Sequence, residues 1–139
     1  MKKNNSGFSL VELIIVIAIM AVLIGVLAPQ FIKYVERSRE STDLQNIEEI
    51  KTAAEAYVAD KGLGKADEIK INMSSSACTI TLPTTATGDL KEYGVDATKM
   101  KLKGKWSGAI EWSYKNYVWT CNTASVTGAA FKADGTPIS

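Results

Sequence analysis

Residues 7–12 read GFSLVE and residues 13–28 read LIIVIAIMAVLIGVLA. The second stretch has 16 residues and no charged or strongly polar side chain. A helix needs about 20 mostly apolar residues to cross the hydrocarbon core of a bilayer. Residues 8–32 meet that length if the polar residues near the two ends are tolerated. We therefore predict a membrane-spanning helix, because a buried helix of a small soluble domain would keep a polar face.

The residues on either side of the apolar stretch predict its orientation. Lys2 and Lys3 precede it, and basic residues favour the cytoplasmic side, so the C-terminal part is expected to be exported. A conventional secretory signal is cleaved after its apolar core. Here the small residues in that place, 25–28, adjoin Pro29, and cleavage there would remove the whole anchor. The order of these elements is therefore not that of a conventional secretory signal.

Glu12 is the one charged residue between Phe8 and Ile32. An ionised carboxylate there costs roughly 2.5–3.5 kcal/mol on insertion scales, so a functional role is the default hypothesis. Cleavage before Phe8 would create a positive α-amino group at a similar depth. That amine is about 6 Å away along the chain's own helix, so the amine of a neighbouring, axially shifted copy has the better geometry. The alternative is a carboxyl group that stays protonated or reaches the membrane interface.

GFSLVE, the apolar run behind it and Pro29 together resemble the class III signal of type IV pilins and type II secretion pseudopilins. The resemblance covers roughly the first 60 residues. It implies cleavage between Gly7 and Phe8 by a membrane-embedded aspartic prepilin peptidase, and N-methylation of Phe8. It also implies that Glu12 docks the subunit onto a neighbour during filament assembly.

The resemblance implies an α+β fold in which a long N-terminal helix packs on a small antiparallel β-sheet head. Four parts are expected: a leader at 1–7, a transmembrane or filament-core helix at 8–31, an amphipathic spine helix at 32–61 and a β-rich head at 62–139. Gly25 and Pro29 weaken one turn of the first helix, because proline lacks an N–H and crowds the carbonyl of Gly25. The resemblance adds that this turn can unwind in a filament, and an ordinary kink is the alternative.

Residues 32–61 carry an apolar stripe at i, i+3, i+4 spacing, which predicts the amphipathic helix. Members of the stripe are Ile32, Val35, Leu44, Ile47, Ile50, Ala54, Tyr57 and Val58. Most charged residues fall on other faces. Glu36 with Arg39, and Glu48 with Lys51, have the i, i+3 spacing of helical ion pairs. The stripe is expected to pack against the head.

The composition after residue 61 changes to a β type. Alternating and β-branched runs predict strands at 68–73, 78–83, 99–103, 109–114 and 117–123. The last two flank Lys115-Asn116, which we interpret as a tight hairpin turn. A helical turn is expected at 89–93 and a closing turn at 133–137. An antiparallel sheet folded over the apolar stripe of the helix is the economical arrangement.

Cys78 and Cys121 are the two cysteines of the chain. Without histidine or C-x-x-C spacing they do not indicate a zinc or redox site. An exported domain favours a disulfide. A bridge would close a loop of some 40 residues and contribute roughly 3–4 kcal/mol in the chain-entropy model. We therefore predict a Cys78–Cys121 disulfide.

Lys99, Lys101, Lys103 and Lys105 would line one face of the strand at 99–103 and its extension. Such a basic surface could touch DNA phosphates or another anionic surface. A solvated edge strand that its lysines protect from pairing is the favoured interpretation. The net charge of +1 likewise does not indicate nucleic acid as a partner.

The sequence predicts no enzyme, no metal site and no cofactor, since it has no histidine, no glycine-rich phosphate loop and no nucleophile motif. Three hypotheses remain. The chain is a pilin of a surface filament, a pseudopilin of a type II secretion or competence DNA-uptake fibre, or a solitary membrane-anchored protein. The third leaves Glu12 unexplained.

The pilin hypothesis is favoured over the pseudopilin hypothesis. Major secretion pseudopilins usually carry a tyrosine-proline-threonine segment after the long helix, and this chain has GLGKAD at 62–67. The modest head favours a major subunit that serves adhesion, motility or aggregation. The expected partners are identical subunits in a helical filament, the prepilin peptidase, the assembly platform with its ATPase, and the membrane. The expected location is the cytoplasmic membrane, with a cytoplasmic N-terminus, and then the cell surface.

Overall fold

The computed structural model describes residues 7–106 and 108–122. In chain order its elements are α1, β1, β2, two short 3-10 helices η1 and η2, β3 and β4. The chain forms two compact units, residues 1–35 and 36–139. Lys2, Lys3 and the closing turn expected at 133–137 lie outside the described residues.

The first unit contains the N-terminal part of α1, which spans Leu10–Lys61. The most apolar stretch of α1 has a mean hydropathy of 3.1 and is 0% buried, and α1 is the one helix among the described residues that is long and apolar enough to cross a membrane. Pro29 lies inside α1, and the helix is continuous through Gly25 and Pro29. An apolar surface of this extent is unsuited to water. It requires lipid or other protein around it.

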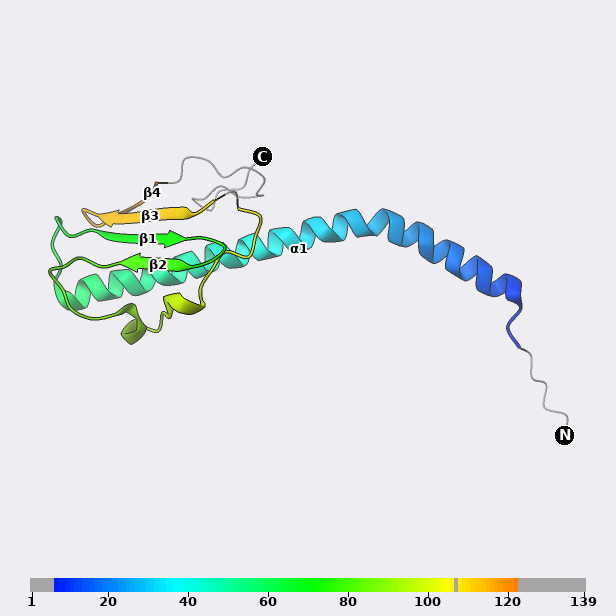
Figure 1. Ribbon diagram of the computed structural model, residues 1–139, viewed down its shortest axis with the longest axis horizontal. Helices are drawn as coiled ribbons and strands as arrows, with labels where there is room; N and C mark the ends of the chain where they lie inside the picture. The colour runs from blue at the N-terminus through cyan, green and yellow to red at the C-terminus, as the bar shows by residue number, and fades with distance from the viewer. Residues whose placement is uncertain (1–6, 107, 123–139) are drawn as a thin grey trace, which may run out of the picture. The chain divides into compact units, whose positions relative to one another are not determined.

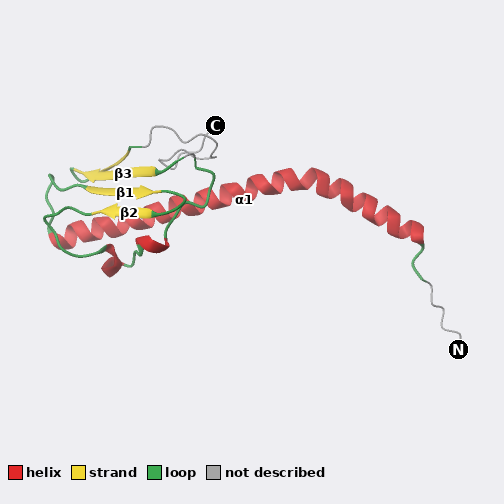
Figure 2. Ribbon diagram, viewed as in Figure 1, coloured by secondary structure: helices red, strands yellow, loops and turns green. Residues whose placement is uncertain are grey.

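The second unit combines the C-terminal part of α1 with one antiparallel sheet of four strands in the order β2-β1-β3-β4 (Figures 1 and 2). The strands are β1 at Ile69–Met73, β2 at Cys78–Thr81, β3 at Ile110–Lys115 and β4 at Val118–Cys121. These bounds confirm four of the predicted strands to within about two residues. η1 at Leu90–Tyr93 confirms the helical turn. The α+β fold, with a long N-terminal helix on a small antiparallel sheet, is therefore confirmed.

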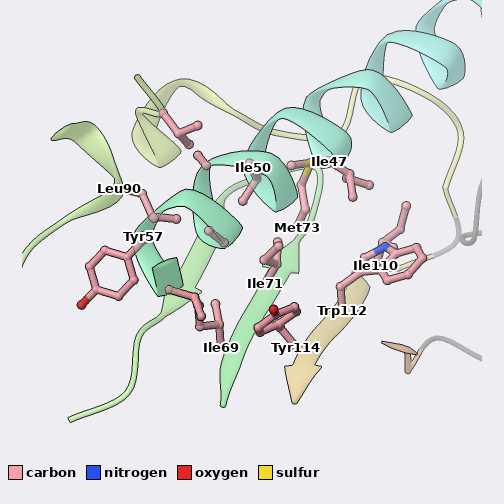
Figure 3. Packing of buried hydrophobic residues seen from close by; sticks show 14 of the residues in the cluster. Ile47, Ile50, Tyr57, Ile69, Ile71, Met73, Leu90, Ile110, Trp112 and Tyr114 are labelled. Carbon is pink, nitrogen blue, oxygen red and sulfur yellow. The ribbon is translucent and has the colours of Figure 1, made fainter. Parts of the chain in front are cut away.

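The core of the second unit lies between α1 and one face of the sheet. Alternation along β1 turns Ile69, Ile71 and Met73 inward, and each is at most 1% exposed. Figure 3 shows them beneath Ile47 and Ile50 of α1. The predicted stripe supplies the helix side of this core through Ile47, Ile50, Ala54, Tyr57 and Val58. The earliest residue of the stripe, Ile32, is 60% exposed and belongs to the first unit.

The β3–β4 hairpin turns one residue later than predicted. Lys115 pairs with Val118, so the two turn residues are Asn116 at φ 54° and Tyr117 at φ 63°. Positive φ at both positions defines a type I′ turn, whose twist matches that of the flanking strands. Moving the two-residue turn by one position changes each cross-strand partner by two residues, so every side chain of β4 stays on the same face of the sheet. Tyr114 therefore lies opposite Trp119, with ring centroids 4.9 Å apart.

The strand predicted at 99–103 is wrong. η2 occupies Ala97–Lys99, and residues 100–105 form a loop. Leu102 is buried in that loop, and its N–H donates to the Ser74 carbonyl at 2.9 Å. The alternation of lysine with apolar residues thus reflects a loop that is held against the rest of the unit. These lysines do not protect a sheet edge.

The predicted Cys78–Cys121 disulfide is not formed in this structure. Cys78 begins β2 and Cys121 ends β4, and these are the two opposite edge strands of the sheet. Three strand spacings of about 4.8 Å separate them. A disulfide needs Cα atoms within about 7 Å of each other. The strand order therefore keeps the two residues too far apart for a bridge within one chain.

Candidate functional site

Ser9 and Glu12 form a capping box at the start of α1. The Ser9 N–H donates to Oε2 of Glu12 at 2.9 Å, and the Val11 N–H donates to Oγ of Ser9 at 3.4 Å. Both bonds satisfy N–H groups that have no acceptor in the first helical turn. A carboxylate at this position is also favoured by the helix dipole. Glu12 thus has a partner in its own chain, which the sequence argument overlooked.

Gly7 and Phe8 precede α1 in non-helical backbone. Phe8 is 93% exposed. A Cβ added at Gly7 would meet no atom within 4 Å, so packing in this chain does not require a glycine there. The peptide bond between the two residues is open to approach. Gly25 is similarly open, with no atom within 4 Å of an added Cβ.

Three carboxylates of α1 lie against the loop at 102–106, and two of them, Glu36 and Asp43, accept hydrogen bonds from it. We call Glu36, Glu40 and Asp43 the carboxylate clasp. Their i, i+4, i+7 spacing places them on one helix face. Asp43 is 0% exposed and accepts from the backbone N–H groups of Lys103 at 2.8 Å and Gly104 at 2.7 Å.

Asp43 also accepts from the indole N–H of Trp106 at 2.8 Å. Glu36 accepts from the backbone N–H of Lys105. The ion pair predicted between Glu36 and Arg39 is therefore replaced by a bond to the loop. The pair predicted between Glu48 and Lys51 is confirmed, at 2.8 Å.

Gly104 is required by the close approach of the loop to the clasp. A Cβ added at Gly104 would lie 2.6 Å from Cγ of Glu40 and 2.9 Å from Nε1 of Trp106. Glu40 is itself 1% exposed. Any larger residue would push the loop away from α1 and break the bonds to Asp43.

The aromatic residues of the hairpin are used for packing on α1. Nζ of Lys51 lies 4.4 Å from the ring centroid of Trp112 and 5.8 Å from that of Trp119. Trp119 also donates its indole N–H to Oε1 of Glu55 at 2.8 Å. A cation over an indole face is attracted by the ring quadrupole. These contacts connect the exposed edge of the sheet to the helix.

The structure therefore separates the predicted site residues into distinct places. Gly7, Phe8 and Glu12 lie together at the N-terminal turn. Gly25 and Pro29 lie within the apolar helix, and the two cysteines lie on opposite edges of the sheet. The sequence did not predict the clasp, because no local pattern indicates which backbone N–H groups its carboxylates accept from. The capping box had an available signal, the S-x-x-E spacing of residues 9–12.

The fold and the N-terminal turn define a protein with one exposed apolar N-terminal helix and a small α+β head. Residues 2–28 match the family model described as the prokaryotic N-terminal methylation motif. The chain is 39% identical over 58 residues to the type IV major pilin protein PilA of Myxococcus xanthus, a match that covers 42% of this chain and 26% of that protein. It is 37% identical over 76 residues to the type IV major fimbrial protein FimA of Dichelobacter nodosus, covering 55% and 46%.

A longer match extends into the head. The chain is 31% identical over 104 residues to the prepilin peptidase-dependent protein A of Clostridium perfringens, covering 73% of this chain and 66% of that protein. No solved structure was found to match. The chain spans 26% and 46% of the lengths of the two relatives named first. By this motif and these relatives, the chain is similar to proteins of the type IV pilin family.

Proposed function

We propose that this chain is a structural subunit of a type IV pilus filament. The observation that carries the proposal is the helix of the first unit, whose apolar stretch is 0% buried. Such a surface needs a bilayer before assembly and other copies of the same helix afterwards. The relatives are named as major pilin and fimbrial proteins, which favours a filament subunit over a pseudopilin.

Processing is proposed to begin at the open bond between Gly7 and Phe8. A prepilin peptidase removes residues 1–7, and Phe8 becomes the N-methylated N-terminus. Residues 8–31 then form the membrane anchor and later the filament core, residues 32–61 the spine and residues 62–139 the head. Gly25 and Pro29 provide the weakest helical turn, which is available for unwinding when subunits pack.

Glu12 is proposed to serve two stages. In the single chain its carboxylate accepts from the Ser9 N–H at 2.9 Å. Cleavage adds a positive α-amine one residue further toward the N-terminus. In the filament the carboxylate pairs with the amine of a neighbouring subunit, because in an apolar core an unpaired charge is expensive.

The subunit is proposed to be non-enzymatic and to act through assembly. Its partners are identical subunits, the prepilin peptidase and the assembly platform with its ATPase. Before assembly it lies in the cytoplasmic membrane with its N-terminus in the cytoplasm. Afterwards it is exposed on the cell surface, in adhesion, motility or aggregation.

The experiment that tests this function compares Glu12→Gln with Glu12→Val in cells that also carry the wild-type chain. Glutamine keeps a capping box but has no charge, whereas valine loses both. Filament yield is measured by electron microscopy of sheared surface material labelled with an antibody to the head. We expect both variants to be excluded from long filaments, and wild-type incorporation of either would refute the docking role.

Two further observations complete the test. Gly7→Val should accumulate as the uncleaved precursor, which mass spectrometry of the N-terminus detects. Wild-type chain that is cleaved but found only in short fibres or in the membrane fraction would favour the pseudopilin alternative.

A further inference from the structure

The clasp changes the charge of the surface around it. Glu36 and Asp43 direct their oxygens at backbone N–H groups of the loop, and Glu40 and Asp43 are at most 1% exposed. Glu40 and Asp43 are thereby removed from the outer surface, and Glu36 is half-buried. Within the described residues, Arg39 forms no ion pair with Glu36, whose carboxylate accepts from the Lys105 N–H instead.

Five exposed cations are close in sequence to the clasp or to the loop bonded to it. On a helix with 3.6 residues per turn, Arg37 and Arg39 lie on either side of the face that carries Glu36 and Glu40. Residues 100–106, which contain the docked loop, add three lysines. The five residues are Arg37, Arg39, Lys101, Lys103 and Lys105, which we call the basic patch, and all are exposed.

Within residues 7–106 and 108–122, no member of the basic patch forms an ion pair. Lys99 is not a member, because its Nζ lies 3.6 Å from a carboxylate oxygen of Asp96. The patch is also held in place, since the N–H groups of Lys103 and Lys105 are bonded to the clasp. A fixed group of unpaired cations is suited to binding anions.

We propose that the basic patch binds the phosphate groups of anionic lipids at the outer surface of the membrane while the subunit is anchored there. The location follows from chain connectivity. Arg37 follows Ile32, the end of the apolar segment, by five residues, and five residues reach at most about 17 Å. The headgroup layer begins where the apolar segment ends. Arginine and lysine at this depth are attracted to anionic headgroups.

The inference rests on the membrane-anchored stage of the proposed function and not on filament assembly. Lipid binding would keep the head at the membrane until assembly withdraws the subunit. It gives the loop at 102–106 a purpose that an edge strand would not have. The same cations would be in position for other anions, and the experiment separates those cases.

The test uses the full chain in two kinds of vesicle, phosphatidylcholine alone and phosphatidylcholine mixed with phosphatidylglycerol. An amine-reactive acetylating reagent is added, and mass spectrometry follows the modification rate of each lysine. In the anionic vesicles we expect Lys101, Lys103 and Lys105 to react roughly fivefold more slowly. The protection should vanish in about 1 M salt, where the Debye length is about 3 Å. Lys65 and Lys115 serve as internal controls and should react equally in both.

Variants test whether the five cations act together. Arg37→Gln with Arg39→Gln should reduce the protection of the three lysines at least twofold. Lys65→Gln with Lys115→Gln is the matched control and should leave it unchanged. Circular dichroism of each variant verifies that the head is folded.

Three outcomes would overturn the proposal. Equal modification in both vesicles would show that anionic lipid does not occupy the patch. Protection that arises in neutral vesicles only on addition of duplex DNA would assign the patch to nucleic acid. Protection found only in assembled filaments would assign it to a neighbouring subunit. Failure of filament assembly, by contrast, leaves this measurement unaffected and bears on the proposed function alone.

Discussion

Removal of the Asp43 side chain should strongly destabilise the second unit. Asp43→Ala deletes the acceptor of the Lys103 and Gly104 N–H groups and of the Trp106 indole N–H. Each buried donor left without an acceptor costs about 1–3 kcal/mol. The site is 0% exposed, so water does not reach it without local opening. Three donors at that cost sum to about 3–9 kcal/mol, which is a large part of the 5–15 kcal/mol that stabilises a typical domain.

The measurement is urea unfolding of the full chain in detergent micelles, followed by tryptophan fluorescence and by circular dichroism. Trp106 reports directly on the clasp, because its indole N–H is one of the three donors. Asp43→Asn should cost less than Asp43→Ala, since the amide oxygen still accepts one bond. Glu49→Ala, at an exposed position of the same helix, is the matched control and should stay within about 0.5 kcal/mol. A loss below about 1 kcal/mol for Asp43→Ala would refute the role of the clasp.

Three other predictions concern the head. The bond from the Tyr93 hydroxyl to Asp60, at 2.7 Å, raises the pKa of Tyr93 to about 12 from 10.0. Its stabilising effect should persist below pH 10 and disappear as the pH rises toward 12. Tyr93→Phe should therefore flatten the fall in urea midpoint over that range, and parallel profiles of the two proteins would contradict the bond. Reducing agent should leave the melting temperature unchanged, since Cys78 and Cys121 are not bridged; a fall of several degrees would show that a disulfide forms. Tyr117→Gly should stabilise the head by about 0.5–1 kcal/mol, because relief of left-handed backbone strain at this position exceeds the entropy cost of ordering a glycine. A lower thermal midpoint of the variant would indicate that contacts of the tyrosine ring outweigh that strain.

Local patterns were sufficient to predict most of the secondary structure. Alternation from Ile69 to Met73 specified β1, and the spacing of Ile47, Ile50 and Tyr57 specified the buried face of α1. The hairpin was recognised but its turn was misplaced by one residue. The error arose because Asn116 is suited to either central position, and pairing along the strands decides between them. Alternation alone does not distinguish the two placements of the turn, since both keep each β4 side chain on the same face of the sheet.

The candidate site likewise contains residues that a contiguous stretch of sequence identifies and residues that only the fold brings together. Gly7, Phe8, Glu12 and the apolar helix were identified from adjacent residues, since processing, membrane insertion and capping all act on a contiguous stretch. The clasp joins residues more than sixty positions apart, as in the Asp43 to Gly104 bond. No local sequence pattern predicts this hydrogen bond. Glu36 was assigned to Arg39 because a helix offers that partner, but the folded loop offers a better one.

The sequence by itself therefore determined the long apolar helix, the amphipathic stripe that follows it and the α+β class of the head. These follow from apolar length and residue periodicity, which act over a few turns of chain. Only the tertiary structure decided that Cys78 and Cys121 lie on opposite edges and that the lysine-rich segment forms a loop bonded to α1. Within residues 7–106 and 108–122, it also leaves Lys101, Lys103 and Lys105 without an ion pair. The physical reason is that strand order and buried carboxylates are set by which distant segments share one core.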